Sequence, residues 1–132
     1  MTASSTVKRV FSGSPWEKKI GYCRAVRSGN FIAVSGTAPM NPDGTVHGPG
    51  DPYLQTRRCL DIIGKALEEL GAGFEHVVRT RMYVTQADQW QEFGRAHGEY
   101  FAENPPATAL VEVKALIDPA IMIEIEVDAI LP

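Results

Sequence analysis

The sequence predicts an α+β domain in which two helices cover one face of a mixed β-sheet. Residues 120–129 alternate between an apolar set and a mostly acidic set, which is the period of a half-buried strand. Residues 51–70 repeat apolar side chains at helical spacing. Strand-like and helix-like segments alternate along 132 residues, enough for one core and too few for two, so we expect a single domain over residues 1–132.

Three strands are expected before the first long helix, over residues 7–11, 22–27 and 31–35. The second and third flank Ser28-Gly29-Asn30, whose residues tolerate positive φ, so they should form a β-hairpin. Residues 12–19 are expected to be a polar loop with Trp16 as its only large side chain. Residues 37–50 hold three prolines and three glycines and predict a longer loop.

Two helices with a strand between them are expected next. The first helix has Asp51 as its N-cap and Pro52 at its first position, and it ends at Gly71. The second spans residues 88–102, where Asp88 and Gln91 resemble a capping box. Residues 77–85 between them are rich in β-branched side chains and short enough for a strand. One face of that strand would carry Val78, Thr80, Met82 and Val84, and the other Arg79, Arg81 and Tyr83.

The last two strands are expected over residues 108–113 and 120–129, as antiparallel neighbours joined by a turn at Ile117-Asp118-Pro119. Their polar faces would carry Thr108, Glu112, Glu124, Glu126 and Asp128. Two helices can cover only one face of such a sheet, so Leu110 and Met122 would be bare on the other. Self-association through that face, with closed symmetry, is therefore expected.

Composition and charge restrict the function classes. A net charge of −3 and a pI near 5.6 show no excess of positive charge that would bind nucleic acid, so a small organic ligand is the favoured partner. No run approaches the roughly 20 apolar residues of a membrane span. Residues 1–14 are polar and lack the apolar core of a secretory signal, so a cytoplasmic location is expected. Without a histidine pair at ligand spacing or a phosphate-binding glycine loop, we expect no metal and no cofactor.

Cys23 and Cys59 show no CxxC spacing and no secretory context, so two reduced, packed thiols are expected. Trp16 and Trp90 are expected to pack in the core or in an interface. Ser35 has no Gly-x-Ser-x-Gly elbow around it and is interpreted as a hydrogen-bonding group of a pocket.

An ordered set of short motifs resembles the RidA (YjgF) family. The motifs are Gly21-Tyr22, Gly29-Asn30, Val34-Ser35-Gly36-Thr37 with Pro39, Gln55-Thr56, Val77-Val78-Arg79-Thr80, Pro106-Ala107, Val111-Glu112-Val113 and Ile123-Glu124-Ile125-Glu126. The similarity runs from about residue 20 to residue 130. The resemblance implies a chorismate-mutase-like fold that assembles as a homotrimer, with sheets inward, helices outward and three clefts between subunits.

The resemblance also implies an activity. RidA proteins hydrolyse reactive enamines and imines of the 2-aminoacrylate type to keto acids and ammonia; an arginine holds the substrate carboxylate and a glutamate positions or activates water. By motif position, the glutamate falls on Glu124 and the pocket tyrosine on Tyr22. The family's Ser-Gly turn falls on Ser35 and Gly36.

The family's arginine that holds the substrate carboxylate has no counterpart at the matching position of this sequence. The family's Pro-Ala-Arg is Pro106-Ala107-Thr108 here, and Leu110 replaces a frequent cysteine. A threonine hydroxyl cannot grip a carboxylate as a bidentate guanidinium does, so the resemblance leaves the substrate open. We hypothesise that Arg81 or Arg24 supplies the positive charge for an anionic ligand. A cross-strand ion pair of Arg81 with Glu112, Glu124 or Glu126 is an equally good interpretation.

Two further residues have alternative interpretations. The alternation that places Glu124 on a polar face is by itself more typical of a solvated strand, whereas its family position favours a role in catalysis. His97 lies on the apolar stripe of the second helix, where a packed histidine is commoner than a general acid or base.

Three functions follow from these observations. The first is a trimeric RidA-like hydrolase or deaminase acting on a small, reactive, nitrogen-containing metabolite. The second is a trimer that binds a small carboxylic acid without turnover. The third, a ribonuclease, is disfavoured by the acidic pI.

Overall fold

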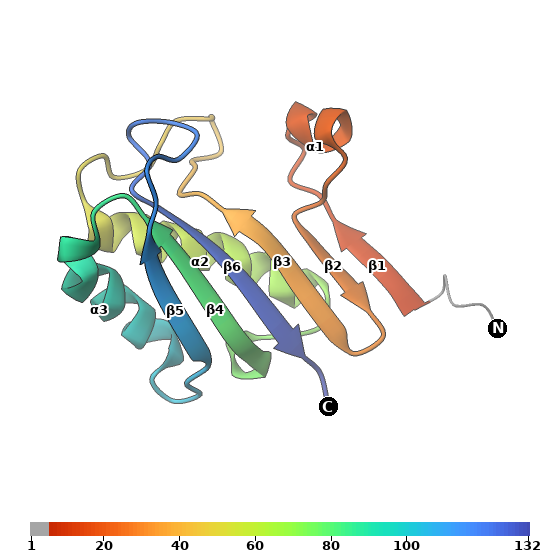
Figure 1. The fold of residues 1–132 in the computed structure, drawn as a ribbon. Helices are drawn as coiled ribbons and strands as arrows, with labels where there is room; N and C mark the ends of the chain where they lie inside the picture. The colour runs from red at the N-terminus through yellow and green to blue at the C-terminus, as the bar shows by residue number, and fades with distance from the viewer. Residues whose placement is uncertain (1–5) are drawn as a thin grey trace.

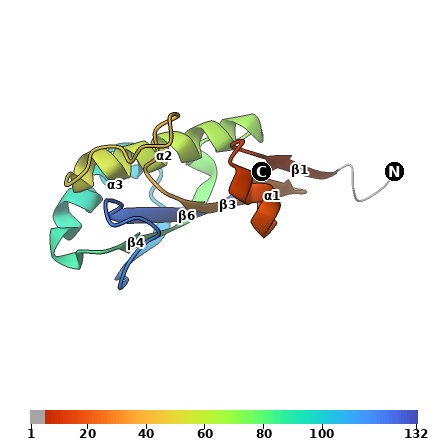
Figure 2. The same cartoon turned by 90° about the horizontal axis from the view of Figure 1, so that it is seen from above.

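The computed structural model describes residues 6–132 and contains a six-stranded mixed sheet with two long helices on one face (Figures 1 and 2). The strands are β1 (Val7–Val10), β2 (Ala25–Ser28), β3 (Phe31–Thr37), β4 (Val77–Val84), β5 (Ala107–Glu112) and β6 (Ile123–Ile130). The helices are α1 (Pro15–Ile20), α2 (Pro52–Glu69) and α3 (Trp90–Phe101), with 3-10 turns η2 (Phe74–His76) and η3 (Ala87–Gln89). The strand order is β1-β2-β3-β6-β4-β5, and only β4 and β5 pair in parallel. This arrangement confirms the predicted α+β class.

The elements that depend on local sequence form as predicted. β2 and β3 pair around the Ser28-Gly29-Asn30 turn, in which Gly29 has φ 62°. The Asp51 side chain accepts a hydrogen bond from the Leu54 N–H at 3.0 Å, and Pro52 begins α2. The apolar stripe of α2 is buried against β3 and β6 and forms one wall of the core.

A helix replaces the polar loop that was expected over residues 12–19. The Ser14 hydroxyl caps α1 by accepting from the Trp16 N–H at 3.3 Å, and Pro15 occupies the first helical position. Ser14-Pro15 is the same start signal as Asp51-Pro52, and it decides the conformation even in a polar segment. Trp16 is 58% exposed in the single chain, so it does not pack in the core, and its packing in an interface stays a prediction.

The capping box predicted at the start of α3 does not form. Asp88 lies in η3, and α3 begins at Trp90 without a side-chain cap. The Glu112 carboxylate, at the end of β5, instead accepts from the Ala87 N–H at 2.9 Å. Trp90, like Trp16, is 58% exposed rather than in the core.

The final two strands are not neighbours, because β4 lies between β5 and β6. The connection from β4 through α3 to β5 is the crossover that a parallel strand pair requires. Met122 is only 8% exposed and Leu110 packs against the core, so the prediction that both would be bare is wrong. Val78 was expected on one face with Thr80, Met82 and Val84. Those three residues are buried, whereas Val78 is 45% exposed, because a bulge between Val77 and Arg79 shifts the register.

One face of the sheet carries no helix, and it is here called the open face (Figure 2). The strand registers place on it Arg79, Arg81 and Tyr83 of β4 and Glu124, Glu126 and Asp128 of β6. Phe31, Val111 and Ile130 on the same face are 43–46% exposed. The sheet therefore has an uncovered face, as expected, but its exposed apolar residues are Phe31, Val111 and Ile130, and not Leu110 and Met122. Self-association through it stays a prediction.

Candidate functional site

Glu124 sits on the open face where β3, β6 and β4 run side by side, paired with Tyr83. Its carboxylate is half-buried and lies directly against Gly36 of β3. A Cβ at position 36 would come within 2.3 Å of Glu124 Oε2, so glycine is what leaves room for the carboxylate. Gly36 has no positive φ; its requirement is one of space.

The electrostatics of Glu124 suit proton transfer. Burial raises the pKa of its carboxyl group above the ordinary value, Arg24 opposes that shift and Glu126 adds to it. No described residue donates a hydrogen bond to this carboxylate, nor does an arginine or lysine of the described chain form an ion pair with it. A carboxylate that is partly desolvated and left unpaired is a stronger base than one at the surface.

Arg24 brings a positive charge to this site without neutralising it. Its Nη2 donates to the Gly36 carbonyl oxygen at 2.6 Å, which links the guanidinium to the Glu124 contact. Its Nε is buried and finds no acceptor among residues 6–132. A buried donor left without a partner costs about 1–3 kcal/mol, so this nitrogen favours an acceptor atom from a bound molecule.

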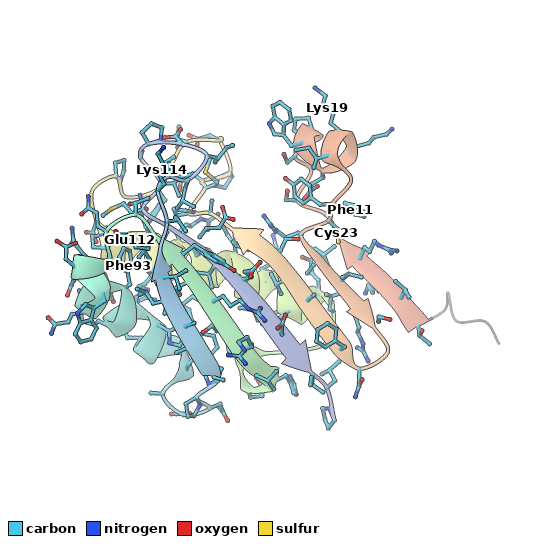
Figure 3. All side chains as sticks on the ribbon, viewed as in Figure 1. Phe11, Lys19, Cys23, Phe93, Glu112 and Lys114 are labelled. Carbon is cyan, nitrogen blue, oxygen red and sulfur yellow. The ribbon has the colours of Figure 1, made fainter. Side chains whose placement is uncertain are left out.

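Ser35 and Tyr22 occupy different surroundings. The Ser35 hydroxyl donates to the Cys23 carbonyl oxygen at 2.7 Å, so it holds the segment before β2 in place. Tyr22 and Cys23 line a surface hollow of about 330 Å³, together with Phe11 and charged residues. Figure 3 shows Phe11 and Cys23 close to each other below α1. Tyr22, Cys23 and Arg24 are therefore consecutive residues of one segment beside the site. A direct ligand contact for Tyr22 and Ser35 stays a prediction.

Arg81 lies on the open face as predicted, and it forms ion pairs there. Its guanidinium is 3.2 Å from Asp128 and 3.8 Å from Glu126. The Tyr83 hydroxyl also donates to Glu126 at 2.6 Å, and that hydrogen bond raises the pKa of the Tyr83 phenol. The cross-strand ion pair was the alternative interpretation of Arg81, and the contribution of this residue to a ligand site stays a prediction.

Thr108 lies on the opposite face from Glu124 and Arg81. The sequence had predicted Thr108 and Glu124 on the polar faces of two neighbouring strands. Its partner on β4 is Thr80, whose side chain is fully buried on the helix side. Thr108 Oγ1 is 2.5 Å from Thr80 Oγ1, which is 2.8 Å from His97 Nε2 on α3. This role of Thr80 was not predicted from the sequence. The signal was a polar residue on an otherwise apolar strand face, since buried hydroxyls need partners.

The remaining predicted residues are placed as follows. Leu110 packs against the core on the helix side, beside Met82. Cys23 is partly exposed and Cys59 is buried, both with free thiols. Burial raises the pKa of the Cys59 thiol, which makes it unreactive.

Between residues 6 and 132, no three histidine, cysteine, aspartate or glutamate side chains gather into a group that could hold a metal ion. No helix in that range combines the length and apolar character that a bilayer crossing requires.

Comparison with known proteins identifies the family. The family model described as Endoribonuclease L-PSP matches residues 16–131. The chain belongs to this family, also called the RidA or YjgF family. Among RidA relatives, "Uncharacterized protein SCO2049" of Streptomyces coelicolor is 40% identical over 126 residues, covering 96% of this chain and 93% of the relative. A RutC family protein of Pyrococcus abyssi is 37% identical over 100 residues, covering 75% and 79%.

Solved structures of RidA proteins have the same fold. Rv2704 from Mycobacterium tuberculosis, a member of the YjgF/YER057c/UK114 family, superposes with a TM-score of 0.85 at 43% identity, covering 95% of this chain and 99% of that one. The YjgF protein of E. coli superposes with a TM-score of 0.77 at 32% identity, covering 86% and 91%. The resemblance seen in the sequence motifs is thereby confirmed.

Proposed function

We propose that this RidA family member is a hydrolase of a small, reactive enamine, imine or related nitrogen-containing metabolite. The observation that supports the proposal most is Glu124: a half-buried carboxylate with a raised pKa and no neutralising partner in the described chain. Such a group can take a proton from water as the water oxygen attacks an imine carbon. Collapse of the resulting carbinolamine releases ammonia and leaves a carbonyl product.

The same site supports an anionic ligand. Arg24 holds one buried, unpartnered N–H close to the backbone that carries Gly36. In the proposed site this guanidinium supplies the positive charge that Thr108 cannot, and Arg81 contributes to the surrounding field. The buried Arg24 Nε–H, which has no acceptor among the described residues, equally favours the second function, a trimer that binds a small carboxylic acid without hydrolysis.

The proposal includes a homotrimer with clefts between subunits, and the cytoplasm as its location. The open face supports self-association, because three large apolar side chains are exposed on it beside paired charges: Phe31, Val111 and Ile130. A ribonuclease activity is not part of the proposal, since the chain is acidic and its open face carries three carboxylates. Light scattering on the purified protein tests the trimer.

The activity is tested with freshly generated 2-aminoacrylate. The parent protein should release ammonia faster than the uncatalysed reaction, and Glu124→Gln should lower the rate by about 10²–10⁴-fold. Glu126→Gln is the matched control, because Glu126 is a carboxylate two positions along on the same face, and it should keep most of the activity. If the parent releases no ammonia but binds pyruvate, and Arg24→Ala abolishes that binding, the non-catalytic function is correct.

A further inference from the structure

Residues 11–23 leave the sheet after β1 and return to it at Arg24. The Arg24 N–H donates to the Val10 carbonyl oxygen at 2.7 Å and closes this loop at its base. The loop contains α1, which stands beyond the ends of β1 and β2 (Figure 1). The residue that closes the loop is therefore also the one whose guanidinium reaches Gly36 in the proposed site.

Glu17 is buried in this loop, with an exposed fraction of 4%, whereas the other residues of α1 are exposed. Its carboxylate accepts hydrogen bonds from the Ser12 N–H at 2.9 Å, the Ser12 hydroxyl at 2.8 Å and the Gly13 N–H at 3.2 Å. The start of α1 is already capped by Ser14, so this carboxylate does not serve as the helix cap. The hydrogen bonds instead fix a negative charge inside the loop that Arg24 closes.

Arg24 acts on two carboxylates, Glu17 and Glu124. Burial raises the pKa of the Glu17 carboxyl group, but hydrogen bonds from Ser12 and Gly13 and the positive charge of Arg24 together hold this pKa below its ordinary value of 4.5. Glu124 has the same ordinary pKa; burial raises it, and Arg24 opposes the shift. Glu17 therefore loses its proton at a lower pH than Glu124 does, and it is ionised when Glu124 titrates.

The strand order places Arg24 between these two carboxylates. The loop that holds Glu17 follows the edge strand β1, Arg24 comes directly before β2, and Glu124 lies on β6 beyond β3. Within residues 6–132, Arg24 forms a direct ion pair with neither carboxylate. Its Nη2 is held by the Gly36 carbonyl oxygen, and its buried Nε has no acceptor in the same range. A guanidinium placed in this way is attracted from both sides and is captured by neither.

We propose that Glu17 is a positioning residue of this site: it attracts Arg24 toward α1 and thereby prevents the guanidinium from closing an ion pair with Glu124. Glu124 then stays an unpaired base, and the buried Nε–H of Arg24 stays available to an anionic ligand. The inference rests on the proposed function, in which Glu124 takes a proton from water. In this role Glu17 acts through Arg24 and does not contact the substrate.

Titration of Glu124 by ¹³C NMR of the glutamate side chains, without substrate, tests the proposal. The Glu124 signal is the one that is missing in Glu124→Gln. In Glu17→Gln the pKa of Glu124 should fall by about 1 or more, since an adjacent arginine lowers the pKa of a carboxyl group by about 1–3. Glu103→Gln is the matched control, because it removes one negative charge from an exposed glutamate after α3, and it should leave the pKa of Glu124 unchanged.

Removal of Arg24 separates this role from a general loosening of α1. In Arg24→Gln the pKa values of Glu17 and Glu124 should both rise, because each carboxyl group has lost the same positive charge. In Glu17→Gln/Arg24→Gln the pKa of Glu124 should equal its value in Arg24→Gln, because the guanidinium that carries the effect is absent.

Other ionisable groups face this region, and all of them remain in the double variant. On the open face Glu126 also raises the pKa of Glu124, and burial raises the pKa of the Cys59 thiol on α2, which stays neutral. The hollow beside Glu17 adds Arg9, Lys18, Tyr22 and Cys23, and α2 and the open face add Arg58, Arg81 and Tyr83. A shift in the pKa of Glu124 that disappears with Arg24 cannot come from any of these groups.

The outcomes decide the position of Arg24 whether or not the protein is a hydrolase. A pKa of Glu124 in Glu17→Gln equal to that of the parent overturns the proposal, and so does a fall of the same size with and without Arg24. If Glu17→Gln does not fold, Arg24→Gln decides, since a rise in the pKa of only one carboxyl group shows that the two do not share Arg24. In an active protein, the acidic limb of the pH profile for ammonia release should move to lower pH in Glu17→Gln by the amount seen in the NMR titration. If the parent releases no ammonia, the proposed hydrolase is wrong, whereas the NMR titrations still test the pairing of Arg24.

Discussion

The substitution Gly36→Ala offers a direct test of the geometry at Glu124. The new methyl group would lie 2.3 Å from Oε2 and 3.0 Å from the carboxyl carbon, whereas ordinary contact begins near 3.4 Å. The carboxylate must therefore move by about 1.1 Å, the difference between 3.4 and 2.3 Å. A displacement of this size can cost a catalysed reaction about 10²-fold.

Stability should change little in the same variant. The clash falls on the end of a flexible side chain, and the backbone at Gly36 has no positive φ, so alanine adopts it without strain. The free energy of unfolding should change by less than about 1 kcal/mol. For a chain of this length, that corresponds to a Tm shift below about 5 °C.

The assay compares kcat/KM for ammonia release and Tm between the parent, Gly36→Ala and a control. Gly94→Ala is a suitable control, because Gly94 lies on α3 with no atom within 4 Å of an added Cβ. It should keep full activity and gain about 0.5–1 kcal/mol in stability from the better helix former. A Gly36→Ala enzyme as active as the parent, when Glu124→Gln is inactive, would refute the requirement for this carboxylate position.

Three further predictions concern stability and reactivity. The pKa of Glu124 is higher in the folded chain than its ordinary value of 4.5, so the folded chain binds this proton more tightly than the unfolded chain does. Protonated Glu124 therefore stabilises the fold at a pH below 4.5, and this contribution is lost as the pH rises through the pKa of Glu124 in the folded chain. The midpoint of urea unfolding should therefore be higher for Glu124→Gln than for the parent at pH 7, and equal for the two proteins at pH 4. A difference in midpoint that does not depend on pH contradicts this prediction. Gln55→Leu should cost about 2–6 kcal/mol in urea unfolding, because the buried amide bonds two backbone groups of the segment before β6 at 2.8 Å each; a loss under 1 kcal/mol would be inconsistent. Ellman's reagent should titrate the partly exposed Cys23 in the native protein and the buried Cys59 only after unfolding, and two fast thiols would disprove the placement of Cys59.

Much of the candidate site could be predicted from short motifs. Glu124 and Gly36 were expected in one pocket, with Arg24 as one of two candidate cations, and the structure brings all three to one end of β3 and β6. Their contacts were not predictable. The spacing of residues along a chain does not indicate which carbonyl oxygen a guanidinium will reach. Nor does it indicate at which glycine the absence of a side chain leaves room for a carboxylate.

By itself, the sequence determined the elements whose cause is local. The Asp51-Pro52 start of α2, the turn at Gly29 and the alternation along β6 each depend on residues within a few positions of one another. The Ser14-Pro15 start of α1 was equally local and was overlooked in the sequence. Backbone φ preferences and side-chain capping act over such short distances.

Only the tertiary structure decided which strands are neighbours and which way each polar face turns. The insertion of β4 between β5 and β6 places Thr108 beside Thr80 and His97 instead of beside Glu124. Alternation within a strand defines two faces but cannot say which one is buried, because that depends on partners far away in the chain. The helices that cover one side of the sheet make that choice, and with it they separate the Glu124 site from the Thr108 chain of hydroxyl groups.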